Sequence, residues 1–471
     1  MDGTGNPWLR ADLGITGDRI VAVGALDGAT AATVIDARDQ VVSPGFIDVH
    51  SHAAEGIRNA ALHQAQPLIA QGVTTLIVNP DGGGPIDLAA QRAAIEAARP
   101  GPNVALLIGH GSVRRAVMAD ARREPTGDEL AKMKDLVRRA MDEGSFGLSS
   151  GLFYTPGSFA KTEEVIELTK VAAERGGLYT SHIRDEGNYD TGVRASVREV
   201  IRIAEEARTV GIVTHMKALG RDSWGLGPAL VKDIEDARAR GVQVFADQYP
   251  YEASSTSLRA ALVPGGVEPT EAIVEQNLKR RNGPDAVLIA SYAADRTLNG
   301  KTLTEIATMK GLNPVRAALA LMDGGNASIV SFNMSEDDIA SIMRAPFTMA
   351  SSDGGLITVG NSHPHPRDYG AFARRLAVYV RERKVVPLEF AIRSMTSLPA
   401  SVFGLTDRGV IRPGAFADVV IFDPGAVRDA ATYAEPQKLA EGVSDVLVNG
   451  VLIRRDGKFT DAAPGRVLRK K

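Results

Sequence analysis

The chain has 471 residues, a formal net charge of −3 and a pI of about 6.3, which argues against a nucleic-acid partner. It contains no cysteine, so disulfides, thiolate metal ligands and a cysteine nucleophile are excluded. No stretch approaches the roughly 18 uncharged apolar residues of a membrane span, and the first residues lack the apolar core of a signal peptide. We therefore expect a cytoplasmic protein that binds no membrane. A homo-oligomer is compatible with the sequence.

Composition divides the chain into two kinds of region. Residues 1–43 form short strand-like runs with turns, and residues 405–471 repeat the pattern in ADVVIFDP and VSDVLVNGVLIRRDGK. We expect the two ends to build one small β-sandwich. Residues 44–404 alternate apolar strand-like runs with amphipathic helical segments, which indicates βα units and a parallel sheet. The predicted fold is α/β, with a TIM-like (β/α)8 barrel and a small β-sandwich domain formed by both termini.

One helix carries clear start and stop signals, in the segment PTGDELAKMKDLVRRAMDEG. Thr126 and Glu129 have the spacing of a capping box, and Gly144 supplies the C-terminal stop. A longer connection follows YPYEASST, at about residues 256–345, and exceeds a normal βα loop. We expect it to form an inserted subdomain that covers the barrel mouth, where long loops often determine specificity.

Eight strand candidates occur in the barrel region, and polar residues gather at their C-terminal ends. The candidates are GFIDVHSH, TTLIVNPD, VALLIGHGS, SFGLSSGL, GLYTSHIRDE, IVTHMKALG, VQVFADQYPY and FTMASSD. The polar residues are His50, His52, Asp81, His110, His182, His215, Asp247 and Asp353. A β/α barrel builds its active site at that face, whereas a packed core would keep these positions apolar.

The histidines predict a metal site. His50 and His52 are one residue apart at the end of a strand, so both imidazoles point the same way. His182 and His215 are about one βαβ unit apart and should lie on adjacent strands. Taken singly, each is more often a hydrogen-bonded structural residue. Together with Asp353 at the end of the eighth strand, they form a donor set that suits Zn²⁺ or a similar divalent ion.

These motifs, with GHGSVRRAVM, GLSSGLFYTPG, SHIRDEG, ADQYPYEASSTSL, HPHPRDYG and PGRVLR, resemble the amidohydrolase superfamily and within it the N-acyl-D-amino-acid deacylases, or D-aminoacylases. The matches occur in order over nearly the whole chain. The resemblance implies a distorted β/α barrel with a small β-domain made from both ends. It also implies a metal-dependent enzyme that hydrolyses the amide of N-acyl-D-amino acids, a small-molecule substrate class, with metal-activated water.

The resemblance also assigns roles to residues. His50 and His52 are expected to hold the weaker metal, His182 and His215 the tighter one, and Asp353 to act as general acid/base and to touch the first metal. Substrate binding is expected at these positions: Lys217 and Arg367 on the substrate carboxylate, and Tyr154, Tyr249 and Ser255 nearby. An arginine can grip a carboxylate with two parallel hydrogen bonds.

The sequence departs from the family pattern in three places, and the first two departures leave the metal content open at one or two divalent ions. Asp81, in NPDG, stands where the family usually has cysteine. We interpret Asp81 as a carboxylate that replaces that ligand, although P-D-G-G is also a common turn sequence. Ala53 and Ala54 follow HSH where the family usually offers an acid. The chain also starts later than the family's first β-strand, as a truncated or trimmed β-domain would.

Several other polar residues are expected to be structural. These are His63, His110, His363 and His365, with His110 the one that could also touch the site. Arg184 and Glu186 are expected to orient ligands rather than react. Arg259 would suit an acidic substrate side chain, or would equally face solvent.

Two alternative functions remain open. A cyclic-amide hydrolase of the dihydropyrimidinase or dihydroorotase kind usually needs a modified lysine at the end of strand four. Here that strand ends in SSGLFYTPG and Lys161 lies well beyond it. The other alternative is a catalytically silent metal-binding homologue, which would need none of Asp353, Lys217 and Arg367.

Overall fold

A barrel of eight parallel strands forms the centre of the protein, seen here in a computed structural model that describes residues 1–360 and 362–470. Two parallel sheets supply the strands, in the orders β16-β4-β5-β6 and β15-β11-β10-β9-β8-β7. The sheets join because β6 and β7 are successive pieces of one strand, and β15 and β16 of another. The bounds are β4 (Phe46–His52), β5 (Val73–Val78), β6 (Asn103–Leu106), β7 (Ile108–Gly109), β8 (Gly147–Gly151), β9 (Leu178–His182), β10 (Gly211–Val213), β11 (Val244–Gln248), β15 (Thr348–Ala350) and β16 (Gly354–Gly355).

All eight predicted strands are present, and the predicted fold class is confirmed. The two interrupted strands make the barrel a distorted one. Side-chain alternation along the strands separates an inner core from an outer one. Ile77 and Ile212 belong to the inner core, which helix residues Leu398 and Phe403 join. Leu76 and Val213 belong to the outer core, which the surrounding helices cover.

Helices follow most of the barrel strands and pack against one another in chain order, α5 on α6, α6 on α7 and α7 on α8. The capping box of α5 is confirmed, because Thr126 Oγ1 accepts from the Glu129 N–H (3.2 Å) and Glu129 Oε2 accepts from the Thr126 N–H (2.7 Å). The barrel helices are α1 (Ala54–Ile57), α2 (Gln66–Ile69), α3 (Leu88–Ala98), α4 (His110–Met118), α5 (Gly127–Asp142), α6 (Thr162–Ala173), α7 (Val193–Ala207), α8 (Gly227–Ala239), α13 (Glu336–Arg344), α14 (Arg367–Arg374), α15 (Leu388–Met395) and α16 (Ser397–Phe403), with a π-helix at Arg375–Glu382.

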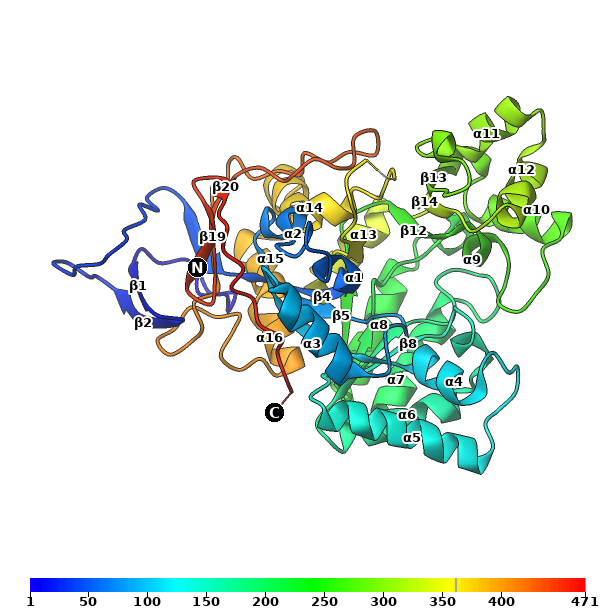
Figure 1. Cartoon of the computed structure of the whole chain (residues 1–471), viewed down its shortest axis with the longest axis horizontal. Helices are drawn as coiled ribbons and strands as arrows, with labels where there is room; N and C mark the ends of the chain where they lie inside the picture. The colour runs from blue at the N-terminus through cyan, green and yellow to red at the C-terminus, as the bar shows by residue number, and fades with distance from the viewer. Residues whose placement is uncertain (361, 471) are drawn as a thin grey trace.

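Both termini build the small β-domain, as predicted. Its five-stranded antiparallel sheet has the order β20-β19-β18-β17-β3, so β3 from the N-terminal part pairs with β17 from the C-terminal part. Figure 1 shows the blue and red ends of the chain side by side. The bounds are β1 (Asp12–Thr16), β2 (Arg19–Gly24), β3 (Val41–Pro44), β17 (Val419–Phe422), β18 (Val443–Val448), β19 (Val451–Arg455) and β20 (Lys458–Phe459).

An inserted lobe separates β11 from β15 and lies at the upper right of Figure 1. Its antiparallel sheet has the order β12-β14-β13, and its helices share a core of their own around Leu262, Ile289 and Ile306. The bounds are β12 (Ala253–Ser257), α9 (Leu258–Leu262), α10 (Glu271–Arg280), β13 (Val287–Ser291), α11 (Leu303–Lys310), α12 (Pro314–Asp323) and β14 (Ser328–Phe332). Short 3-10 turns lie at Gly157–Phe159, Arg221–Ser223, Pro284–Ala286 and Arg296–Leu298.

Helix α13 falls within the range expected for the inserted subdomain, but it packs against α8 and β15 of the barrel. Among the described residues, no helix is both long and apolar enough to span a bilayer. The exact domain limits, the cytoplasmic location and the oligomeric state stay predictions.

Candidate functional site

A cavity of about 740 Å³ lies at the C-terminal ends of the barrel strands. Four histidines and two aspartates converge there, each from the end of a strand: His50 and His52 from β4, Asp81 after β5, His182 from β9, His215 after β10, and Asp353 between β15 and β16. The six residues that the sequence predicted as metal ligands are therefore brought together.

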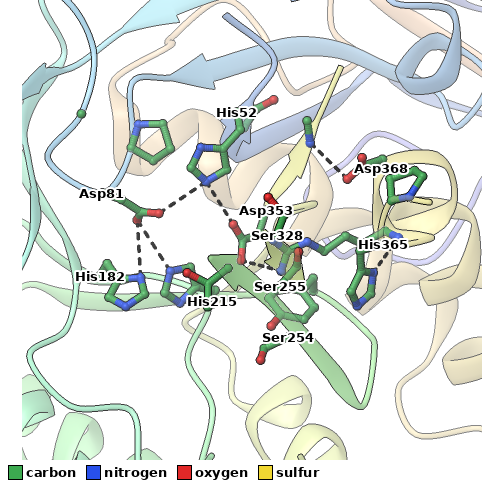
Figure 2. Close-up of a pocket in the computed structure, with 18 of the residues that line it drawn as sticks. His52, Asp81, His182, His215, Ser254, Ser255, Ser328, Asp353, His365 and Asp368 are labelled. Carbon is green, nitrogen blue, oxygen red and sulfur yellow. Dashed lines mark hydrogen bonds and ion pairs between the residues drawn. The ribbon is translucent and has the colours of Figure 1, made fainter. Parts of the chain in front are cut away.

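Asp81 lies at the centre of the histidines (Figure 2). Its Oδ1 is 3.3 Å from His50 Nε2, 3.6 Å from His215 Nε2 and 3.9 Å from His182 Nδ1. Its Oδ2 is 3.4 Å from His52 Nε2. The side chain therefore points into the cluster, which the turn interpretation of NPDG would not require.

Asp353 lies between the histidine pair, His50 and His52, and the guanidinium of Arg367. Its Oδ1 lies 3.5 Å from His50 Nε2 and 3.2 Å from His52 Nε2, and its Oδ2 accepts a hydrogen bond from Arg367 Nη1 at 2.7 Å. One carboxylate oxygen therefore faces the histidines while the other is fixed in orientation by a guanidinium.

Three of the six residues have an uncommon backbone conformation. Asp81, His215 and Asp353 all have positive φ, at 56°, 35° and 49°, a region that non-glycine residues seldom adopt. Such conformations persist where surrounding structure imposes them, and they cluster at functional sites. The surrounding barrel therefore holds three of the six residues in a backbone conformation that is unfavourable for residues other than glycine.

Two buried aspartates accept hydrogen bonds from the backbone at His215 and beside Asp353. Asp247 Oδ1 accepts from the His215 N–H at 2.9 Å, and Asp48 Oδ1 accepts from the Ser352 N–H at 2.9 Å, next to Asp353. Burial raises the pKa of Asp48 to about 6, against the opposing effect of the hydrogen bonds from Ser352. The sequence did not single out Asp48, although an acid within the apolar run GFIDV was a visible signal.

The donor atoms of the cluster fit a divalent cation. Both ring nitrogens of His50 and of His182, and Oδ1 of Asp81, are buried with no hydrogen-bond partner. Leaving a buried polar atom unsatisfied costs about 1–3 kcal/mol. Tetrahedral ligands about 2.0–2.1 Å from a zinc ion lie roughly 3.3 Å apart, close to the separations around Asp81. Imidazole and carboxylate donors suit Zn²⁺ and also other first-row divalent ions.

Electrostatics favour a cation at the same place. Burial would raise the pKa of Asp353, but Arg367 and His215 outweigh burial and hold it below its ordinary value. Burial would lower the pKa of His52 and His215, but neighbouring carboxylates raise both to about 10. Burial lowers the pKa of His182 to about 4. The carboxylates therefore make the cluster negative enough to hold protons on two histidines, and a divalent ion would supply that positive charge instead.

Glu186 contacts both His215 of the cluster and Lys217, one of the predicted substrate-binding residues. Its Oε1 lies 2.9 Å from His215 Nδ1 and is hydrogen-bonded to Lys217 Nζ. Lys217 is also 2.8 Å from His215 Nδ1 through its Nζ. This geometry agrees with the expectation that Glu186 orients other groups. Arg184 instead pairs with Glu199 at 2.8 Å.

The predicted substrate residues all line the cavity: Lys217, Arg367, Tyr154, Tyr249 and Ser255. The Tyr249 ring centroid lies 4.7 Å from Arg367 Cζ and 5.5 Å from Lys217 Nζ, so one aromatic ring lies next to both cations. The Tyr154 hydroxyl is 3.1 Å from Thr256 Oγ1 in the inserted lobe. Barrel and lobe therefore share the wall of the cavity.

The remaining histidines have other partners. His110 Nε2 lies 2.9 Å from Glu164 Oε1, His63 Nδ1 lies 2.6 Å from the Arg99 carbonyl, and His363 Nε2 lies 2.6 Å from the Tyr433 carbonyl. Only His365 among these four lines the cavity, and its Nε2 faces the Ala253 carbonyl at 3.0 Å. The sequence missed Asp368 and Arg281, two further lining residues, because neither follows a predicted strand.

The chain belongs to the amidohydrolase family, whose model matches residues 33–454. The N-acyl-D-glutamate deacylase of Alcaligenes xylosoxydans xylosoxydans is 37% identical, over 100% of this chain and 95% of the relative. The D-aminoacylase of the same organism is 35% identical, over 99% and 95%. The solved N-acyl-D-glutamate deacylase of Bordetella bronchiseptica, complexed with zinc and a phosphonate mimic of the tetrahedral intermediate, superposes with a TM-score of 0.87 at 37% identity, covering 99% of this chain and 97% of that one. The predicted membership among the N-acyl-D-amino-acid deacylases is confirmed.

Proposed function

We propose that this protein hydrolyses the amide bond of N-acyl-D-amino acids, releasing a D-amino acid and a carboxylate. The observation that carries the proposal is the cluster of four histidines around Asp81 and Asp353, which opens into a cavity lined by Lys217 and Arg367. Relatives that match the whole chain are deacylases of N-acyl-D-amino acids, which supports the substrate class.

In this proposal, His50, His52, Asp81, His182, His215 and Asp353 hold one or two divalent ions, with Zn²⁺ as the favoured metal. A bound divalent ion supplies two effects, a lowered pKa of water and polarisation of a carbonyl oxygen. Asp81 contributes a carboxylate that faces all four histidines. Glu186 fixes His215 through its Nδ1, leaving Nε2 directed at Asp81.

Asp353 is the proposed general acid/base. It takes a proton from the attacking water and delivers it to the leaving nitrogen. Its Oδ2 is held by Arg367, and its Oδ1 faces His50 and His52. The low pKa that Arg367 and His215 impose keeps Asp353 ionised and therefore able to accept a proton.

Lys217 and Arg367 are proposed to bind the α-carboxylate of the substrate, with Tyr154, Tyr249 and Ser255 forming the surrounding wall. Lys217 is paired with Glu186 and Arg367 with Asp353, so both cations are held in place before substrate binds. If the substrate's α-carboxylate is held by Lys217 and Arg367 and its amide lies at Asp353, only one enantiomer directs its side chain into the open part of the cavity. The other enantiomer would direct it against the cavity wall.

The test is a screen of N-acetyl and N-formyl derivatives of D- and L-amino acids, with metal analysis of the same sample. We expect turnover of D-substrates, with a preference over L of roughly a hundredfold or more, equivalent to about 3 kcal/mol. Equal turnover of the two enantiomers, or none with either, would contradict the proposal.

The two alternatives have less support. A cyclic-amide hydrolase would need a lysine at the end of β8, but Lys161 is exposed and pairs with Glu124. Lys217 is the lysine that the described cavity presents. A catalytically silent homologue would bind metal without the ion pair between Arg367 and Asp353, so the presence of this pair argues against that alternative. Detection of a carboxylated lysine by mass spectrometry would revive the first alternative.

A further inference from the structure

Three side chains with a permanent positive charge line the cavity, and one of them differs from the other two. Lys217 is paired with Glu186 and Arg367 with Asp353. Arg281, the third, has no carboxylate within ion-pair distance among the residues that the structure describes. The protein therefore presents one uncompensated guanidinium to whatever enters the cavity.

Arg281 is nonetheless buried and held in place. It is 2% exposed and follows the last residue of α10 in the inserted lobe. Its Nε donates to the Ala261 carbonyl at 3.1 Å, and its Nη1 donates to the Asn333 amide oxygen at 3.0 Å in the amide orientation that pairs donors with acceptors. The Tyr189 ring centroid lies 5.9 Å from its Cζ. All these partners are uncharged.

A buried charge without a counter-ion is costly, and a guanidinium that also faces a cavity can be compensated by an anion that binds there. An arginine held in one orientation is suited to a carboxylate, which its planar guanidinium binds through two parallel hydrogen bonds. The geometry of Arg281 therefore fits an anionic group of the substrate better than a structural role.

The location of Arg281 indicates which anionic group this is. The same Asn333 amide oxygen accepts from Ser254 Oγ at 2.9 Å, so Arg281 and Ser254 belong to one wall. Figure 2 shows Ser254, Ser255 and Ser328 together, on the opposite side of the view from Asp81 and His182. Arg281 therefore belongs to the wall contributed by the lobe, whereas Lys217 and Arg367, proposed for the α-carboxylate, come from the barrel.

We propose that Arg281 binds a second carboxylate, carried by the substrate side chain, and so makes the enzyme selective for acidic N-acyl-D-amino acids. This inference rests on the proposed deacylase function and adds its substrate class. Arg259, the arginine that the sequence suggested for such a role, is exposed and donates to the Val267 carbonyl at 3.2 Å. It does not line the cavity, so Arg281 replaces it as the candidate.

The test compares N-acetyl-D-glutamate with N-acetyl-D-glutamine, which has nearly the same shape without the charge. We expect wild-type kcat/KM to favour glutamate by roughly 10- to 100-fold, the range that a charge-assisted hydrogen bond provides. Arg281→Met should bring the ratio close to one by lowering the glutamate value, and Arg281→Lys should keep part of the preference. Arg259→Met, in the same lobe, is the matched control and should leave the ratio unchanged.

Several results would overturn the inference. If the wild-type enzyme hydrolyses N-acetyl-D-glutamate and N-acetyl-D-glutamine with equal kcat/KM, the inference is overturned before any variant is made. A folded Arg281→Met enzyme that keeps the ratio, or loses activity equally on both substrates, would show that Arg281 binds no side-chain carboxylate. N-succinyl-D-leucine carries its extra carboxylate on the acyl group instead. A specific loss on that substrate would place the anion subsite on the acyl side.

Calorimetric titration separates this inference from the proposed function. If the wild-type protein hydrolyses no N-acetyl-D-amino acid, the proposed function fails, but binding of the free amino acids can still be measured. Tighter binding of D-glutamate than of D-glutamine, abolished in Arg281→Met, would support the carboxylate subsite. Equal binding of the two would contradict it.

Discussion

Among the residues that the structure describes, two buried clusters of histidine and carboxylate lie at strand ends, and they are built differently. At the end of β7, His110 Nε2 lies 2.9 Å from Glu164, which also pairs with Arg114. Around Asp81, carboxylate and imidazole atoms lie 3.3 to 3.9 Å apart. In the first cluster each Glu164 oxygen has a direct hydrogen-bond partner and only Nδ1 of the His110 ring lacks one, whereas in the second cluster both ring nitrogens of His50 and of His182 lack partners. Spacing, more than residue type, therefore separates a structural ion pair from a candidate metal site.

The largest effect on turnover is expected at Asp353. Asp353→Asn is nearly isosteric but cannot accept a proton, so kcat should fall on the order of a hundredfold or more. Circular dichroism and metal analysis should show that the fold and the more tightly bound metal are retained. A variant that keeps more than about a tenth of the wild-type rate would show that Asp353 does not transfer the proton.

Asp81 should have the next largest effect, through the metal. Asp81→Ala removes the carboxylate that faces all four histidines, so metal content and activity should fall together, by about tenfold or more at limiting metal. Asp81→Cys should restore binding with a stronger preference for zinc, because thiolate is a softer ligand. Metal analysis after dialysis against a chelator measures both. Full metal content in Asp81→Ala would make Asp81 only a turn residue.

Glu164→Gln should change stability and leave turnover and metal content nearly untouched, which sharpens the contrast between the clusters. Removing one partner of a buried ion pair costs about 3–5 kcal/mol, to be measured by urea denaturation at pH 7. Although burial opposes them, His110 and Arg114 lower the pKa of Glu164 below its ordinary value of 4.5.

The pH dependence of that difference follows from the lowered pKa. The stabilisation is fully present above about pH 4.5 and is lost as the pH falls through the lower pKa of the folded state. The difference between wild type and Glu164→Gln should therefore be constant near neutral pH and shrink in acid. A difference that grows on acidification would contradict this account of the cluster.

Much of the fold could be predicted because the barrel strands are short apolar runs with polar residues at one end. GFIDVHSH illustrates this, since the same eight letters carry both β4 and two of the candidate ligands. The capping box at Thr126 was equally readable, because it depends on residues three positions apart. Both features depend on residues close together in the sequence, so the sequence alone predicts them.

Other features depend on tertiary placement, which has no local signal. Arg259 and Arg281 both lie in the inserted lobe, and nothing in their sequence neighbourhoods indicates which one faces the cavity. The packing of α10 against the rest of the lobe decides it. Asp48 and Asp247 are visible in the sequence as acids within apolar runs, but the neighbouring strand whose backbone each one supports is known only once the barrel is closed.

The positive φ values of Asp81, His215 and Asp353 have a consequence for engineering. Glycine would adopt these conformations without steric cost, and strained positions of this kind each cost roughly 1–3 kcal/mol. A selection for heat resistance alone would therefore favour glycine at the very positions that carry the proposed chemistry. Thermostable variants obtained without an activity screen should therefore include glycine substitutions that remove these side chains.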